Sequence, residues 1–345
     1  MLIANYYSNT DIRIEDRPVP QIHEGECLIK ILASGICGSD LMEWYRRDSV
    51  PLVLGHETAG EVIEVGNGVN HLKPGDRVVV SHHVPCLECR YCQRGHETMC
   101  KTLHSTTYDP GGFSQYVRLP EINTRLGVFP IPKNVTYEEA SFAEPLACVI
   151  RGQNRAGIQK SDAVVVIGSG ISGVLHIALA KARGAEFIIG CDINETRLPW
   201  AAKFGADVTI KDASSISGEL LDNIGRKADI VILTTGHPDA VQAGFETAAD
   251  GSTILLFAPS DPNTTVQIDI NKLFFKHDRT VTTTYANSPN DLKEALSLIA
   301  EKKVPVADMI THRIALDEIQ YGFDLVQNGT KSLKVIVEPN RNGTN

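Results

Sequence analysis

The chain has 345 residues, of which 42% are hydrophobic and 22% charged, and its formal net charge at pH 7 is −9. This length exceeds one ordinary hydrophobic core and predicts about two domains of a globular protein. The acidic balance argues against a nucleic-acid partner, because proteins that bind phosphate backbones usually present a basic face. The sequence has no apolar run near the roughly 18 residues of a membrane span. The N-terminus lacks a signal-peptide core, so we expect a cytoplasmic protein that binds no membrane.

Residues 1–148 contain short β-like runs between Gly and Pro turn signals, which predicts an antiparallel β domain with long loops. The predicted strands include Cys27–Ile31, Glu61–Val65 and Arg77–Ser81. Turn signals such as Pro74-Gly75-Asp76 separate such runs.

Four cysteines within fifteen residues follow the pattern Cys-x2-Cys-x2-Cys-x7-Cys, and they are Cys86, Cys89, Cys92 and Cys100. Tight spacing of this kind suits a metal better than disulfides. Because four thiolates fill a tetrahedral shell, the sequence predicts a structural zinc site that contributes to folding. A zinc ribbon that contacts nucleic acid is the alternative, and the acidic composition disfavours it. The apolar surroundings of Cys27, Cys148 and Cys191 predict small buried side chains.

From about residue 149 the chain alternates between strands and helices, which predicts a parallel, doubly wound sheet. Ala163–Ile167 is a largely β-branched run, typical of a strand buried on both faces. The other predicted elements are the strands Phe187–Cys191, Ile230–Leu233 and Thr253–Phe257 and the helices Ile171–Arg183 and Pro238–Ala249.

A glycine-rich segment directly follows the first of these strands and opens the first helix, and it comprises Gly168, Ser169, Gly170, Ile171, Ser172 and Gly173. In this context the pattern predicts a dinucleotide site. The first glycine permits a tight turn, the second lets the backbone approach the pyrophosphate, and the third allows close packing of helix and strand. The helix N-terminus then faces the phosphates.

Asp192 ends the next predicted strand, 19 residues after Gly173. A carboxylate at this place accepts hydrogen bonds from the ribose hydroxyls and repels a 2′-phosphate, so the sequence favours NAD over NADP. Arg197 keeps NADP open as an alternative, because a nearby guanidinium can hold a phosphate. Asp192 could instead serve only as a helix cap.

Two further pairs of candidate groups lie upstream, Cys37 beside Ser39 and His56 beside Glu57. Neither pair is informative alone, but His56 and Glu57 begin the pattern Gly-His-Glu-x2-Gly-x5-Gly over residues 55–66, and Gly-Asp-Arg-Val follows at 75–78. With Gly-Gly-Phe at 111–113 and Glu-Pro-Leu-Ala-Cys at 144–148, the chain resembles the zinc-containing medium-chain dehydrogenase/reductase family. The resemblance covers essentially the whole chain and is strongest to the polyol (sorbitol-type) and threonine dehydrogenase branch.

The resemblance implies an α/β protein with a mostly β, GroES-like catalytic domain over 1–148, which carries the structural-zinc lobe, and a Rossmann domain over 149–275. Residues 276–345 are too few to fold alone and should return to complete the catalytic domain. Their predicted elements are the helices Asp291–Glu301 and Leu316–Gln327 and the strand Lys334–Val337.

The same resemblance carries a catalytic zinc onto Cys37 and His56. Alcohol dehydrogenases of the family use a cysteine as third ligand where polyol and threonine enzymes have a glutamate, and this chain has Glu144. Glu144 could also lie only behind the ligands. Glu57 is similar to a residue that binds the zinc directly or lies just behind it. Ser39 matches the family's proton-relay hydroxyl.

The chain departs from the family pattern at Met42, where many relatives have a histidine that relays protons or contacts substrate. Met42, Trp44 and Tyr45 then offer an apolar, partly aromatic wall to the substrate, while Glu43 and Arg46 offer contacts to hydroxyls or a charge. That Trp44 and Tyr45 serve only for packing is an equally open interpretation.

We therefore predict a zinc-dependent and NAD-dependent alcohol dehydrogenase with two zinc ions per chain, which oxidises a secondary alcohol, a polyol or a cyclic polyol, and reduces the ketone in reverse. L-threonine or another amino alcohol is the alternative substrate. A non-catalytic nucleotide-binding relative and a zinc-free NADP-dependent reductase are disfavoured, because Cys37, Ser39, His56 and Glu144 are all present. The family resemblance implies a homodimer or homotetramer.

Overall fold

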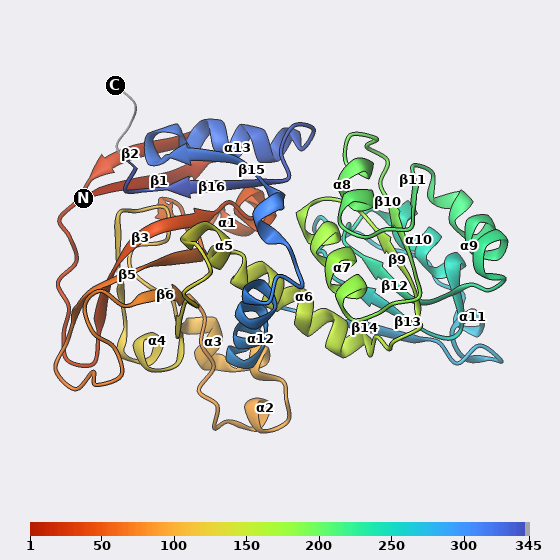
Figure 1. Cartoon of the computed structure of the whole chain (residues 1–345), viewed down its shortest axis with the longest axis horizontal. Coiled ribbons are helices and arrows are strands. Elements are labelled where there is room, and N and C mark those ends of the chain that lie inside the picture. Colours follow the sequence, from red (N-terminus) through yellow and green to blue (C-terminus); the bar gives the residue numbers. More distant parts are fainter. Residues whose placement is uncertain (342–345) are drawn as a thin grey trace. The chain divides into compact units, whose positions relative to one another are not determined.

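The computed structural model describes residues 1–341, and the chain divides into two compact units. Unit 1 comprises residues 1–147 together with the chain from Asn287 onward, and unit 2 comprises Cys148–Ala286 (Figure 1). The sequence pattern placed the second boundary at 275/276. The structure places it at 286/287, because the strand β14 (Thr280–Thr283) still pairs within the sheet of unit 2.

Unit 1 is built on a seven-stranded sheet of order β15-β16-β3-β5-β6-β8, with β7 paired to β3. Its strands are β3 (Cys27–Gly35), β5 (Glu57–Val65), β6 (Arg77–Val80), β7 (Tyr116–Leu119), β8 (Val128–Pro130), β15 (Ile310–Ala315) and β16 (Lys334–Glu338). A second sheet of order β2-β1-β4 consists of β1 (Leu2–Ser8), β2 (Asp11–Asp16) and β4 (Leu52–Val53). All the pairs in both sheets are antiparallel except β15 with β16.

The C-terminal segment returns to unit 1 as predicted, because β16 lies antiparallel to β3 with Ile336 opposite Gly35. Helix α13 (Ile319–Asn328) packs on this region through the buried Phe323, which shares a hydrophobic core with Tyr6 and Phe113. The other helices of unit 1 are α1 (Glu43–Arg46), α2 (Arg90–Gln93), α3 (Lys101–Ser105), α4 (Glu121–Leu126), α5 (Tyr137–Ser141) and α12 (Pro289–Ala300), and α6 (Ala143–Ala156) starts in unit 1 and ends in unit 2.

Unit 2 is a six-stranded parallel sheet of order β11-β10-β9-β12-β13-β14, which confirms the predicted doubly wound α/β fold. Its strands are β9 (Ala163–Ile167), β10 (Phe187–Cys191), β11 (Val208–Ile210), β12 (Ala228–Leu233), β13 (Ala248–Leu256) and β14. Its helices are α7 (Ile171–Ala182), α8 (Leu198–Lys203), α9 (Ile216–Ile224), α10 (Pro238–Thr247) and α11 (Asn271–Phe274).

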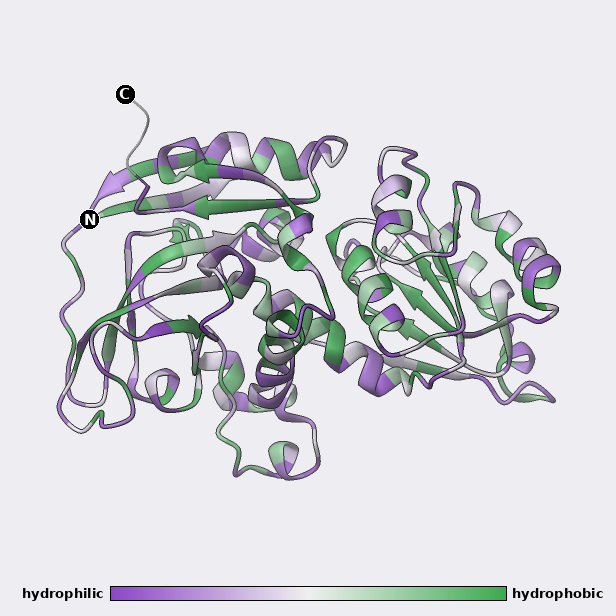
Figure 2. Ribbon diagram, viewed as in Figure 1, coloured by the Kyte–Doolittle hydropathy of each residue, from purple (hydrophilic) through white to green (hydrophobic). Residues whose placement is uncertain are grey.

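The central strands of this sheet are largely hydrophobic (Figure 2), and all five residues of β9 are buried. A parallel strand covered by helices on both faces needs such a continuous apolar run rather than an alternating one. Across residues 1–341, no helix is both long and apolar enough to cross a membrane.

Candidate metal and nucleotide sites

The register between β3 and β5 assembles the first candidate site. The two strands run antiparallel with Gly35 opposite Glu57, so Cys37 lies just past the end of β3 and His56 just before the start of β5. One ligand atom from each of Cys37, His56 and Glu57 lies within 4.8 Å of the other two. A thiolate, an imidazole and a carboxylate form a donor set that Zn²⁺ accepts, so these residues fit a zinc ion.

Asp40 lies beside two of these candidate ligands, His56 and Cys37. It lies in the short 3-10 turn Gly38–Leu41, is fully buried, and accepts a hydrogen bond from the Cys37 amide at 3.0 Å. Its other oxygen lies 3.3 Å from His56 Nδ1, which leaves Nε2 as the ring nitrogen available to a metal. Burial opposes a charge on His56, but Asp40 and Cys37 raise its pKa well above the ordinary value.

The predicted relay residue also lies at this site. The Ser39 hydroxyl donates a hydrogen bond to the Cys37 sulfur at 3.3 Å, and both side chains are half-buried. A hydroxyl this close to the candidate metal ligand is within reach of a substrate oxygen bound at the same centre.

Glu144 lies on α6, is only 7% exposed, and its Oε1 accepts a hydrogen bond from Asn287 Nδ2 at 2.9 Å. Within residues 1–341, the group whose ligand atoms come within 4.8 Å of one another contains Cys37, His56 and Glu57 but not Glu144. Burial raises the pKa of Tyr108 most, and Glu144 adds to this shift while His56 opposes it, so both groups act on the same phenol. Glu144 stays a predicted third ligand.

Two residues of the site were missed from the sequence. Lys334 forms a fully buried ion pair with Glu57, and a lone lysine at the start of a predicted strand was the only signal for it. The ring of His82 lies 5.1 Å from the ring of His56, and within residues 1–341 its buried Nδ1 has no hydrogen-bond partner. Burial, together with His83 and His56, lowers the pKa of His82 well below its usual value, so this imidazole is neutral at pH 7.

The predicted substrate wall is only partly directed at this site. Trp44 and Tyr45 on α1 are 40% and 52% exposed, and their rings contact each other. Arg46 stacks its guanidinium over Tyr45 and reaches to 4.0 Å from Asp40 Oδ1. Half-buried Met42 precedes them, and its amide bonds to the Ser39 carbonyl. The substrate wall therefore stays a prediction. Arg46 is the polar side chain of this segment that reaches Asp40.

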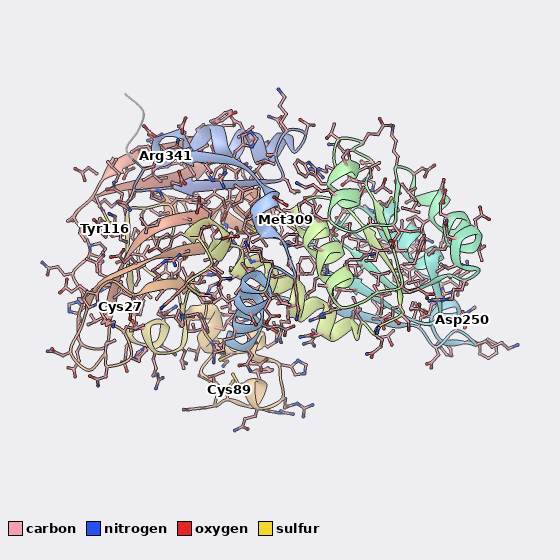
Figure 3. The ribbon with its side chains drawn as sticks, in the orientation of Figure 1. Cys27, Cys89, Tyr116, Asp250, Met309 and Arg341 are labelled. Atoms are coloured by element: carbon pink, nitrogen blue, oxygen red, sulfur yellow. The ribbon has the colours of Figure 1, made fainter. Side chains whose placement is uncertain are left out.

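The four clustered cysteines form the second candidate metal site, in the lobe that carries Cys89 in Figure 3. Their sulfurs lie within 4.8 Å of one another, and two pairs are 3.5 and 3.6 Å apart. These separations are much longer than a disulfide bond of about 2.05 Å and close to the roughly 3.8 Å edge of a ZnS₄ tetrahedron. Amide donors from Glu88 and Cys89 hold the pKa of the Cys86 thiol below its ordinary value, which favours a thiolate. These residues fit a closed, structural zinc site.

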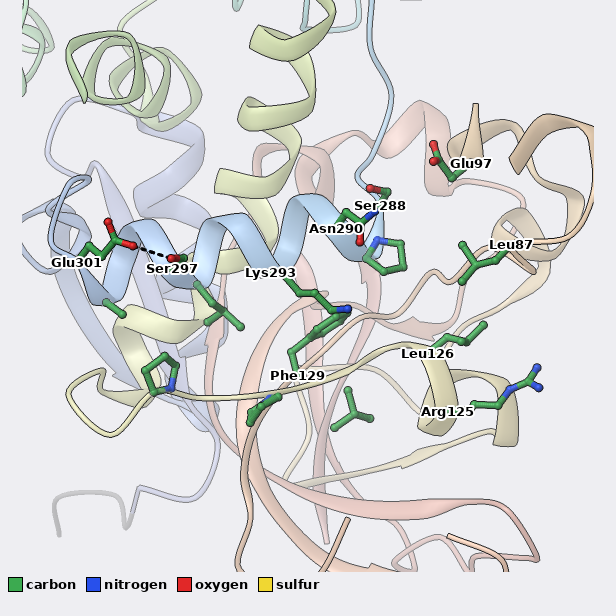
Figure 4. A pocket seen from close by; sticks show the side chains of 16 residues that line it. Leu87, Glu97, Arg125, Leu126, Phe129, Ser288, Asn290, Lys293, Ser297 and Glu301 are labelled. Carbon is green, nitrogen blue, oxygen red and sulfur yellow. Dashed lines mark hydrogen bonds between the residues drawn. The ribbon is translucent and has the colours of Figure 1, made fainter. Parts of the chain in front are cut away.

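A groove of about 800 Å³ in unit 1 borders the cysteine lobe, but none of the candidate metal ligands lines it (Figure 4). Helix α12 contributes Asn290 and Lys293 to one wall, Phe129 of β8 lies opposite, and Leu87 comes from the cysteine lobe. Its lining includes none of the cysteine, histidine or glutamate groups assigned above as ligands, so its size alone does not mark it as the catalytic site.

In unit 2, the glycine-rich segment has the predicted place between β9 and α7. Gly168 has a φ of +100°, and Gly170 is the N-cap of α7. A Cβ on Gly173 would lie 1.9 Å from the Gly168 carbonyl oxygen, so a side chain there would separate the helix from the turn. Ile171 and Ser172 form the first turn of the helix, where free amides favour a phosphate. The segment fits a dinucleotide.

Asp192 lies beside the glycine-rich segment and is hydrogen-bonded to it. Its carboxylate accepts hydrogen bonds from the amides of Ser169 at 2.7 Å and Asn194 at 2.8 Å, and Arg197 lies 3.5 Å away. A Cβ on Gly170 would be 3.9 Å from Arg197 Nη1, which places the guanidinium beside the glycine turn. The structure therefore brings together the carboxylate and the cation that the sequence predicted as opposing determinants of cofactor choice.

The chain is similar in sequence and in fold to known dehydrogenases. Residues 23–133 match the alcohol dehydrogenase GroES-like domain, and residues 173–301 match the zinc-binding dehydrogenase family. Sorbitol dehydrogenase of Gallus gallus is 31% identical over 95% of this chain and 93% of its own length. The structure of 2R,3R-butanediol dehydrogenase from Bacillus subtilis is similar with a TM-score of 0.86 and 26% identity, covering 98% of this chain and 99% of that one. A zinc-binding dehydrogenase from Sinorhizobium meliloti 1021 bound to NADP gives a TM-score of 0.87 at 27% identity, with 98% and 99% coverage.

Fold and sites thus define a zinc-dependent, dinucleotide-binding dehydrogenase. The chain belongs to the zinc-dependent medium-chain dehydrogenase family, in its polyol-dehydrogenase branch, and is an oxidoreductase.

The two metal sites predict opposite effects of losing one cysteine. Cys86→Ala should remove one zinc and lower the melting temperature by about 10 °C, corresponding to roughly 3 kcal/mol, because a closed zinc site contributes folding free energy. Cys37→Ala should remove the other zinc, leave the melting temperature nearly unchanged, and reduce turnover by about 10³-fold. Metal analysis and calorimetry on both variants check this. Full activity of Cys37→Ala would contradict the assignment.

Asp192→Gly should weaken NAD binding by about 10- to 100-fold, because hydrogen bonds to the charged carboxylate are lost. NADP binding should change much less, because the same substitution also removes a repulsion of the 2′-phosphate. Titration calorimetry with both cofactors measures the difference, and Asp239→Gly, at an exposed position of unit 2, is the control. An equal loss for the two cofactors would show that Asp192 only supports the turn through Ser169 and Asn194.

Proposed function

We propose that the chain oxidises a secondary alcohol of a polyol or cyclic polyol to the ketone, with NAD as the hydride acceptor, and catalyses the reverse reduction. The convergence of Cys37 and His56 on one centre, with Ser39 beside them, is the observation that carries the proposal. The names of the sorbitol and butanediol dehydrogenases among the similar proteins support a substrate with neighbouring hydroxyls.

Zinc, when bound, supplies a Lewis acid that lowers the pKa of the substrate hydroxyl. Cys37 and His56 would hold it, with Glu144 as the predicted third protein ligand, and Asp40 would keep the His56 ring oriented through Nδ1. The Ser39 hydroxyl accepts the proton that leaves the substrate oxygen and passes its own proton outward. A dinucleotide held at the glycine turn of residues 168–173 would supply the acceptor for the hydride that leaves the substrate carbon.

The proposed cofactor preference rests on Asp192. Its carboxylate is 6% exposed, lies at the edge of the glycine turn, and retains acceptor capacity for ribose hydroxyls. The Arg197 guanidinium lies 3.5 Å from it and offsets part of its negative charge, which is why NADP is the less favoured cofactor rather than an excluded one. The similar dehydrogenase structure that holds NADP supports keeping this alternative.

L-threonine is the second candidate substrate, and Arg46 is the feature that favours it. Its guanidinium lies 4.0 Å from Asp40 Oδ1 and its side chain is only 19% exposed. A cation so near the zinc ligands suits an anionic group on the substrate, such as a carboxylate.

A screen of NADH formation tests the proposal. Sorbitol, xylitol, inositols, 2,3-butanediol and L-threonine are incubated with the zinc-loaded protein and NAD. Turnover of a polyol, together with its loss in Cys37→Ser, is the expected result. Turnover of threonine alone would favour the second candidate, and turnover that survives in Cys37→Ser would contradict the zinc mechanism.

We further propose that the protein is a homo-oligomer that associates through unit 2. Among the described residues 1–341, the edge strand β14 is paired on one side only. Exposed apolar side chains lie on it and in the segment before it: Ile270 (68%), Phe274 (61%), Phe275 (60%) and Val281 (40%). An unprotected edge with apolar neighbours is an aggregation hazard unless a second strand covers it. Pairing of two β14 strands about a two-fold axis gives a dimer, and a tetramer needs a further contact.

Val281→Lys combined with Phe274→Glu should reduce the mass in solution by half or more, because charges replace apolar contacts at the edge. Light scattering after gel filtration measures the mass. Leu221→Lys, at an exposed position on α9, should leave it unchanged. An unchanged mass in the double variant would place the interface elsewhere.

We also propose a cytoplasmic location. Within residues 1–341 none of the eight cysteines forms a disulfide, and six of them lie within 3.6 Å of another cysteine sulfur or in apolar cores, as a reducing compartment allows.

A further inference from the structure

Lys334 is a charged residue in the interior of unit 1. It is the first residue of β16 and is 1% exposed, among the largest fully buried side chains. Its Nζ donates to the Ile36 carbonyl at 3.0 Å and to Glu57 Oε2, and it lies 5.8 Å from the centre of the Phe142 ring. A buried ammonium is costly unless it is paired, so Glu57 and Lys334 hold each other in place.

Gly35 fixes the position of this pair. A Cβ on Gly35 would lie 1.9 Å from Glu57 Oε2 and 2.7 Å from Lys334 Cε, so both side chains pack against bare backbone. Gly35 stands opposite Glu57 in β5 and opposite Ile336 in β16. The three strands therefore leave little space for the carboxylate to move toward or away from the ammonium.

Glu57 is also a candidate metal ligand, because one of its oxygens lies within 4.8 Å of the ligand atoms of Cys37 and His56. A zinc ion held by Cys37, His56, Glu144 and Glu57 together would have four protein ligands, and such a site is closed to substrate. A carboxylate without a partner in this low-dielectric place would be drawn to the nearest cation. Something must therefore restrain Glu57 if the site is to turn over alcohols.

We propose that Lys334 is a positioning residue that holds the Glu57 carboxylate and thereby keeps one coordination position of the zinc open for substrate. This inference rests on the proposed zinc site at Cys37 and His56. It assigns to β16 an indirect part in the metal chemistry, through the Glu57 carboxylate that Lys334 holds.

A double-mutant cycle on the full-length protein tests the inference, with Lys334→Met, Glu57→Gln and the combination of both. Lys334→Met should retain two metal ions per chain but lose about 10- to 100-fold in kcat/KM, the usual cost of removing a group that orients a metal ligand. In the Glu57→Gln background, Lys334→Met should add little further loss, because no carboxylate remains to be restrained. Lys334→Arg should rescue activity in part, and Lys331→Met, at an exposed position nearby, is the control.

Cobalt provides a readout that a merely structural role would not change. With Co²⁺ in the catalytic site, addition of alcohol should alter the visible absorption of the wild type but not of Lys334→Met, and the double variant should respond again. A response of Lys334→Met like that of the wild type would overturn the inference. If Lys334→Met alone fails to fold, a folded double variant that is far less active than Glu57→Gln would overturn it, and equal activities would support it. A wild type that binds a single zinc per chain would instead refute the proposed zinc site.

Discussion

The antiparallel register of β3 with β5 is the constraint on which the catalytic site depends. Gly35 stands opposite Glu57, so the chain leaves β3 and enters β5 at the same end of the sheet, and Cys37 and His56 meet there. A register shift by one residue would turn Glu57 to the other face of the sheet and separate the ligands. The buried side chains of β3, including Ile29, Ile31 and Ala33, fix the register because they must face the core.

The buried charged groups around this junction each lie against a polar or charged partner. Asp40 faces His56, Lys334 faces Glu57, and Glu144 accepts from Asn287. Each pairing gives a metal ligand or its neighbour a fixed orientation, because in a low-dielectric interior a carboxylate cannot leave its partner without a large cost. The site is therefore held in a fixed geometry by groups that do not themselves bind zinc. Hydrogen-bond partners of metal ligands commonly have this role.

The two metal sites show why the sequence predicts one more fully than the other. The cysteine site spans fifteen residues, so spacing alone indicates that four thiolates meet. The candidate catalytic set draws on residues 37 and 56, which strand pairing brings together, and on the predicted ligand Glu144, which only the family resemblance adds. The glycine turn and Asp192 were also predictable, because β9, α7 and β10 follow one another directly. Lys334 and His82 were not, because no local pattern distinguishes a buried lysine from one on the surface of a strand.

The place of Lys334 also links completion of the fold to completion of the site. Residues after 287 return to unit 1, and β16 pairs with β3 on the edge opposite β5. Until this returning segment is in place, Glu57 lacks Lys334 of β16 as its counter-charge, and the core of Tyr6 and Phe113 lacks Phe323 of α13. Residues 57 and 334 are far apart in the sequence, so their contact closes a long loop. We expect such a contact to form after the local structure. The zinc ligands at 37 and 56 are joined by a short segment and need no such closure. The metal can therefore be bound by Cys37 and His56 before Lys334 restrains Glu57. On this proposal, the open coordination position depends on the complete fold and not on the ligand set alone.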